Sequence, residues 1–184
     1  MKNLIFLLMI LGFVLPAAIG QSFRGLDKSP LDIAYFPDNF AHDRKAGEKA
    51  IVKVTYSRPA KNGRVVFGQL VPYGKVWRTG ANEATEIKVY QTVYLGDKKL
   101  KPGVYSLFTI PGENEWEIIL SKDIDYWGAY SYEQEHDVFR VKVPAGKTDQ
   151  AVENFTIQFK LIGTGKAAMV MVWDQTMVEV PVSF

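Results

Sequence analysis

The sequence predicts an all-β domain, an antiparallel β-sandwich of about nine short strands with little helix, for which a jelly-roll order is one option. Three observations lead to this prediction. Apolar and polar residues alternate along many short segments. Gly and Pro turns separate these segments, and none of them has the apolar spacing of a convincing amphipathic helix. With 184 residues, of which 47% are hydrophobic, the chain can bury one substantial core.

The N-terminal segment 1–20 has the pattern of a secretory signal peptide. Lys2 precedes an apolar run over 4–15, and the segment ends in small residues at Gly20. This run is shorter than the about 20 apolar residues that a membrane-spanning helix needs. We therefore expect cleavage after Gly20, no transmembrane segment, and export to a bacterial periplasm or the outside medium.

The charge of the chain argues against two classes of partner. Its 22 basic and 20 acidic residues are interspersed and give a formal net charge of +2. This balance predicts neither nucleic-acid binding nor attraction to an anionic membrane surface. The chain contains no Cys, so the core alone is expected to hold the exported protein together, without disulfides. No protein partner follows from the sequence.

The mature chain is expected to have an irregular lead-in over 21–47, with a short first strand, and one domain over 48–184. Strand alternation begins at 52–57. The Asn62-Gly63 turn and the apolar segment 65–67 then predict a hairpin over 50–68.

Later strands are expected between further turns, such as Gly96-Asp97 and Pro111-Gly112, and their apolar residues should form the core. Met169, Met171 and Trp173 are predicted core residues for this reason. The predicted strands are 85–95, 104–110, 116–120, 137–143, 154–162, 167–174 and 176–184.

Several kinds of catalytic site are not indicated. A zinc site needs clustered ligands, whereas the chain has only His42 and His136 and no Cys, so no metal and no cofactor are expected. The G-x-S-x-G turn of a serine hydrolase is absent, and GKVWRTG lacks the context of a phosphate-binding loop. His136 and Asp137 are neighbours on a strand and would point to opposite faces, which argues against an acid/base pair.

Two loops concentrate the remaining polar and aromatic side chains. The first, VPYGKVWRTGANEAT over 71–85, is neither strand-like nor helical, and the second, DIDYWGAYSYEQEHD, covers 123–137. Arginines and carboxylates among aromatic walls are typical of small-molecule and sugar sites. The candidate ligand-binding residues are Arg58, Tyr73, Trp77, Arg78, Asn82, Glu83, Trp127, Tyr130 and Arg140.

A structural interpretation of the same residues stays open. Arg78 and Glu83 are a natural pair to tie the first loop to itself, and for Trp77 and Trp127, taken singly, a packed core or rim ring is favoured over binding. The whole 71–85 loop could equally be a plug that packs across one end of the fold.

The chain also resembles a known family. The segments YSRP, PYGKVWRTGANEAT, YSLFTIPG and WGAYSYEQEHDVFRVKV are similar to the DUF2911 family of exported bacterial proteins, and the likeness extends over about residues 28–182. The resemblance implies an all-β secreted domain and draws attention to the same 71–85 loop. It implies no reaction, substrate or catalytic residue.

Two alternative functions from different classes are therefore considered. The favoured one is a binding or structural module that recognises a small molecule or a carbohydrate through the 71–85 and 123–137 loops. The alternative is an enzyme, a metal-independent hydrolase or lyase in which Glu83 is the general base and Arg78 or Arg140 stabilises negative charge.

Overall fold

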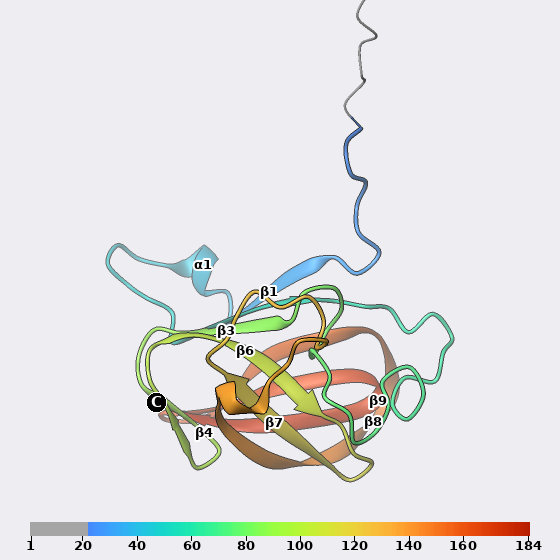
Figure 1. The fold of residues 1–184 in the computed structure, drawn as a ribbon. Coiled ribbons are helices and arrows are strands. Elements are labelled where there is room, and N and C mark those ends of the chain that lie inside the picture. The colour runs from blue at the N-terminus through green and yellow to red at the C-terminus, as the bar shows by residue number, and fades with distance from the viewer. Residues whose placement is uncertain (1–21) are drawn as a thin grey trace, which may run out of the picture.

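The computed structural model describes residues 22–184 and shows an all-β fold, as predicted (Figure 1). The proposed signal peptide over 1–20 lies outside the described residues. In the part of the chain that is described, no helix is long and apolar enough to cross a membrane. The only helical elements there are α1 (Phe40–Asp43) and the short 3-10 helix η1 (Gln134–His136).

Residues 22–184 contain nine strands, and every pair of neighbours is antiparallel. They are β1 (Leu31–Phe36), β2 (Val52–Ser57), β3 (Thr85–Val89), β4 (Val93–Leu95), β5 (Lys98–Leu100), β6 (Gly103–Ile110), β7 (Glu115–Ser121), β8 (Asp137–Gly163) and β9 (Lys166–Ser183).

These strands make one open sheet in the order β1-β2-β3-β6-β7-β8-β9-β4-β5. The long strand β8 connects its two parts, because residues 137–144 pair with β7 and residues 145–163 pair with β9. Register shifts interrupt the β8–β9 ladder, and such irregularities bend strands. The β-sandwich prediction is not confirmed, since hydrogen bonds run continuously through a single sheet that does not close.

The main core lies where the sheet curves back over itself. The rings of Tyr56 on β2 and Phe155 on β8 meet edge to face at 5.9 Å, although their strands are far apart in the strand order. Met169, Met171 and Trp173 are all buried in this cluster, which confirms the prediction that they are core residues.

Strands β6 and β7 are buried on both faces. Leu107 belongs to the main core, whereas the next residue, Phe108, points into a second cluster with Ala84 and Ile119. The 123–137 loop covers this second cluster, because the rings of Tyr126 and Tyr132 pack on Phe108 at 5.5 and 5.0 Å. Part of the 123–137 loop therefore belongs to the core and not to the surface.

The predicted hairpin over 50–68 is wrong. The 65–67 segment forms no strand, and only an isolated bridge joins Phe67 to Val71. Strand β2 already pairs with β1 on one edge and β3 on the other, so it has no edge left for residues 65–67. Val66 and Phe67 are nevertheless buried, because this loop tucks its apolar side chains into the main core.

The remaining strands lie in the predicted segments, but some predicted segments are divided into two strands and others are joined into one. The 85–95 segment divides into β3 and β4, which lie in different parts of the sheet. Conversely, the segments 137–143 and 154–162 belong to one strand, β8, and the last two predicted strands are one strand, β9. The expected lead-in contributes β1, which pairs with β2 along its whole length.

Candidate functional site

The 71–85 loop is held against strand β6 by its own backbone. The amide of Trp77 donates to the carbonyl oxygen of Thr109 at 2.7 Å, and the amide of Thr109 donates back at 2.9 Å. Thr79 is fully buried with a φ of +57°, and its hydroxyl donates to that of Thr109 at 3.1 Å. The Thr85 hydroxyl donates to the Thr79 carbonyl oxygen at 2.6 Å, which closes the loop. The side chains between Trp77 and Thr85 are therefore presented from a fixed backbone.

Trp77 anchors this loop in the main core. Only 7% of the residue is exposed, and its ring stacks on Trp173 with centroids 6.0 Å apart. Its indole N–H donates to the carbonyl oxygen of Gly80 at 3.0 Å. The ring is thus a packing element first, with an edge that reaches a surface cavity.

The two loops singled out in the sequence meet through backbone pairing. Glu83 and Trp127 form an isolated antiparallel bridge. On either side of it, the Ala84 amide donates to the Tyr126 carbonyl oxygen and the Gly128 amide to that of Asn82, both at 2.9 Å. Loop 123–137 is consequently fixed beside the end of the 71–85 loop.

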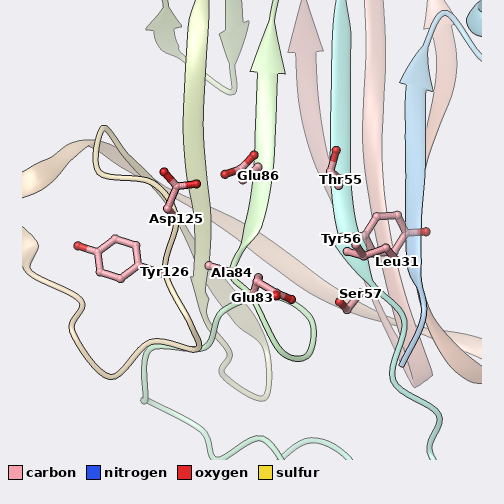
Figure 2. Close-up of a pocket in the computed structure, with 9 residues that line it drawn as sticks. All are labelled: Leu31, Thr55, Tyr56, Ser57, Glu83, Ala84, Glu86, Asp125 and Tyr126. Atoms are coloured by element: carbon pink, nitrogen blue, oxygen red, sulfur yellow. The ribbon is translucent and has the colours of Figure 1, made fainter. Parts of the chain in front are cut away.

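A cavity of about 340 Å³ opens beside this junction, and we call it the acidic cavity. The carboxylates of Glu83, Glu86 and Asp125 line it, together with the apolar side chain of Leu31 and the ring of Tyr126. Figure 2 shows how strands β1, β2 and β3 and both loops contribute to its lining. The cavity therefore combines three acidic groups with apolar walls.

The three carboxylates of the acidic cavity have no basic partner among the described residues. Neither Glu83, Glu86 nor Asp125 forms an ion pair with any basic side chain of residues 22–184. The expected Arg78–Glu83 tie is not among the described ion pairs, so the structural interpretation of that pair is not supported. Unpaired carboxylates that line one cavity give it a negative potential and leave their oxygens free to accept hydrogen bonds.

The ring of Tyr126, which lines the acidic cavity, is fixed by a hydrogen bond from its hydroxyl group. Its hydroxyl donates to Oδ2 of Asp123 at 2.6 Å, and in Figure 2 it points away from Glu83 and Glu86. Burial of the phenol, followed by this hydrogen bond, raises the pKa of Tyr126 to about 12, while the same bond lowers the pKa of Asp123. The ring thus presents its apolar face to the cavity while its polar end is occupied elsewhere.

Two of the predicted arginines hold the fold together through internal partners. Arg58 contacts Oδ2 of Asp32 at 2.8 Å and the hydroxyl of Thr156 at 2.9 Å. Arg140 contacts Asp137 at 2.7 Å and Glu117 at 3.0 Å, so its guanidinium is engaged between two carboxylates.

The other predicted residues lie in three places. Glu83 lines the acidic cavity, whereas Trp77, Arg78 and Asn82 line a second cavity that is described below. Three aromatic residues lie at the surface outside both cavities, with exposed fractions of 39% for Tyr73, 61% for Trp127 and 85% for Tyr130.

Reasoning from the sequence missed most of the acidic cavity. Asp125 and Tyr126 lie in the 123–137 loop, which was singled out for other members, and Glu86 falls in the predicted strand 85–95, outside the candidate residues. Leu31 and Thr55 reach the cavity through strands β1 and β2. No local pattern could have found these two, because their place depends on strand order.

One group of side chains in the described chain has atoms close enough to hold a metal ion. The ligand atoms of Glu133, Glu135 and His136 lie within 4.8 Å of one another. Both glutamates are exposed, and Nδ1 of His136 also lies 3.1 Å from Oδ2 of Asp123. Exposed acidic groups of this kind are common without an ion, and we assign the group no function.

Comparison with protein families gives one match over most of the chain. A family model described as "Protein of unknown function (DUF2911)" matches residues 38–182, which is most of the chain. The chain belongs to the DUF2911 family. The match covers β2 to β9 and both loops of the acidic cavity, and it confirms the resemblance seen in the sequence. No curated protein and no solved structure matches this DUF2911 chain.

Proposed function

We propose that this DUF2911 protein is an exported binding module that takes a small molecule or a carbohydrate into the acidic cavity. The observation that carries the proposal is the placement of three unpaired carboxylates, Glu83, Glu86 and Asp125, around one cavity of about 340 Å³. Ligand sites are concave, largely apolar and furnished with a few convergent polar groups. The signal-peptide pattern over 1–20 supports the export part of the proposal.

The chemistry of the lining selects a class of ligand. Carboxylates accept hydrogen bonds from hydroxyl groups and attract cations, so they favour a sugar or small polyol that carries an amine. The Tyr126 ring and the Leu31 side chain offer apolar surface for the C–H face of such a ligand. The size of the cavity lies at the lower end of the range for ligand sites, which suits one sugar ring.

A calorimetric titration tests this proposal with glucosamine, which is cationic, and glucose, which has the same ring without the ammonium group. We expect glucosamine to bind more tightly by about tenfold, and the Glu83→Gln, Glu86→Gln and Asp125→Asn changes to remove that preference. Glu113→Gln, an exposed carboxylate in the β6–β7 turn, is the matched control and should bind as wild type.

Each outcome of this titration has a distinct meaning. Equal binding of both sugars would retain the binding module but contradict the preference for a cation. If neither sugar binds to the wild-type protein, the carbohydrate proposal fails. If the Glu113→Gln control weakens binding as much as the cavity variants do, the effect is one of net charge and not of the cavity.

The enzyme alternative receives less support from the arrangement. Glu83 is suited to act as a general base in that its carboxylate faces a cavity without a basic partner. However, Arg78 lines a different cavity, and Arg140 contacts internal carboxylates. Neither arginine is therefore placed to stabilise charge on a substrate beside Glu83.

A further inference from the structure

A second cavity, of about 290 Å³, is also lined by residues of the 71–85 loop, and its charged lining is basic. Arg64 and Arg78 both line it, and no Asp or Glu does. The side chains of Trp77 and Trp173 contribute apolar surface, and Ser29 and Asn82 contribute polar groups. We call it the basic cavity.

Arg78 is a partly buried cation that has no counter-ion within residues 22–184. Its guanidinium forms no ion pair with any carboxylate in the described chain, and its buried Nε has no hydrogen-bond partner there. Burial lowers the pKa of Arg78, an effect that the nearby Tyr130 opposes. A buried donor that is left unsatisfied is costly, and arginines in such positions are normally paired. Binding of an anion beside Arg78 would therefore stabilise this site.

Arg64 is fixed at the same cavity by its backbone contacts. Its Nε donates to the carbonyl oxygen of Lys61 at 2.8 Å, and one Nη donates to that of Ala60 at 2.6 Å. These bonds restrain the guanidinium, and no carboxylate of residues 22–184 forms an ion pair with it. The side chain is exposed, which places this second positive charge within reach of a ligand that enters from solvent.

Asp27 contacts two residues that line the basic cavity, and its carboxylate is occupied by hydrogen bonds to them. Oδ1 of Asp27 accepts hydrogen bonds from the backbone amide of Ser29 at 2.7 Å and from the side-chain amide of Asn82 at 3.0 Å. These two bonds lower the pKa of Asp27, but Asp27 forms no ion pair with Arg64 or Arg78. Asp27 thus bonds to two residues of the cavity lining, and within residues 22–184 no carboxylate forms an ion pair with either guanidinium group.

We propose that the basic cavity binds the oxyanion group, carboxylate or phosphate, of a small molecule between Arg64 and Arg78. A guanidinium presents a planar fork of N–H donors that matches such oxygens, and the partial burial of Arg78 strengthens the interaction. The Trp77 and Trp173 edges bound the apolar side of the same site. This site is separate from the acidic cavity, so it stands whether or not a sugar binds there.

The test uses inorganic phosphate and acetate as probes, with sodium chloride at equal ionic strength as the reference. The Nε–Hε signals of the arginines are followed by NMR in the purified protein. We expect at least one probe to shift the Arg78 signal saturably. Arg64→Gln, followed at the Arg78 signal, and Arg78→Gln, followed at the Arg64 signal, should each weaken that binding about tenfold or more. Arg24→Gln, which removes an exposed guanidinium near the N-terminus, should bind as wild type.

The two probes separate the two sources of the oxyanion. A saturable response to phosphate alone assigns a phosphate group, and one to acetate alone assigns a carboxylate. A response that chloride reproduces, or one that Arg24→Gln reduces as much as Arg78→Gln does, overturns the proposal. If Arg78→Gln does not fold, the exposed Arg64→Gln variant decides the matter, because unchanged binding in that variant contradicts a site between the two arginines.

Discussion

The backbones of Glu83 and Trp127 form an isolated antiparallel bridge that joins the 71–85 loop to the 123–137 loop. Flanking hydrogen bonds extend the junction to Ala84 and Gly128. Both Glu83 and Trp127 are exposed, so the contact depends on main-chain geometry and not on the burial of either side chain. The wall of the acidic cavity is therefore positioned by backbone conformation.

Gly128 tests this junction, because its φ of +70° is a conformation that other residues adopt at a cost. A Cβ there would lie 2.7 Å from Cε2 of Tyr130. We expect Gly128→Ala to lower the free energy of unfolding by about 1–2 kcal/mol and to speed hydrogen exchange of the Ala84 and Gly128 amides. Urea unfolding and exchange measured by NMR check both effects.

Gly163→Ala is the matched control for that substitution. Nothing lies within 4 Å of a Cβ at this position, and its φ is not positive. We expect a change within about 0.5 kcal/mol. If Gly128→Ala is as harmless as Gly163→Ala, the junction does not depend on this backbone conformation.

Trp77 and Trp127 should differ strongly in their effect on stability, although they lie in the two loops that the sequence treats alike. Trp77 is packed among Phe67, Phe155 and Trp173, whereas 61% of Trp127 is exposed. We expect Trp77→Ala to lower the free energy of unfolding by about 3–5 kcal/mol and Trp127→Ala by less than about 0.5 kcal/mol. Comparable losses in urea unfolding would contradict the assignment of Trp77 to the core.

Arg58 should contribute to stability by joining the β1–β2 edge to strand β8. It bonds to Asp32, to the Phe155 carbonyl oxygen and to Thr156. The pair with Asp32 is partly exposed and therefore screened by solvent, so we expect Arg58→Gln to cost about 1–2 kcal/mol. The exposed Arg24→Gln variant should leave the denaturation midpoint unchanged, and an equal effect of the two would indicate a general charge effect.

Tyr132 predicts a loss of stability at alkaline pH. Burial, and then its hydrogen bonds to Asp137, raise its pKa to about 12 from an ordinary value of 10.0. Because the folded state holds this proton more tightly, the stabilisation is complete below pH 10 and is lost as the pH rises toward about 12. NMR titration of the Tyr Cζ signals should show a pKa near 12 in wild type and a lower one in Asp137→Asn.

The pH dependence of the free energy of unfolding tests the raised pKa of Tyr132 in a second way. In Tyr132→Phe, the part of the alkaline decline between pH 10 and about 12 that comes from this phenol should disappear. An unchanged decline would show that Tyr132 does not titrate with a raised pKa in the folded protein.

Local patterns in the sequence predicted strands well where burial follows the strand period. Val52, Val54 and Tyr56 alternate with more exposed residues in β2, and the predicted strand 52–57 agrees with the structure. The 65–67 segment shows the limit, since its apolar residues are buried from a loop. Pairing with β2 was decided by competition from β1 and β3, which no window of the sequence contains.

Local sequence patterns were also insufficient to predict the residues of the candidate site. Glu83 was identified because polar residues concentrate in its loop, yet Leu31 and Asp125 join it only through the arrangement of β1 and the 123–137 loop. Arg58 and Arg140 were selected by residue type, and the structure places each among internal partners. Composition therefore indicated the region of the acidic cavity, whereas its lining depends on tertiary contacts.

The most direct test of the proposed function is to map glucosamine on the protein by NMR. We expect the largest amide shifts to fall at residues 83–86 and 125–128, which line or flank the acidic cavity, and to saturate. The same titration of the triple variant Glu83→Gln, Glu86→Gln, Asp125→Asn should leave these amides unmoved. Saturable shifts centred elsewhere, or equal shifts in the triple variant, would contradict the acidic cavity as the binding site.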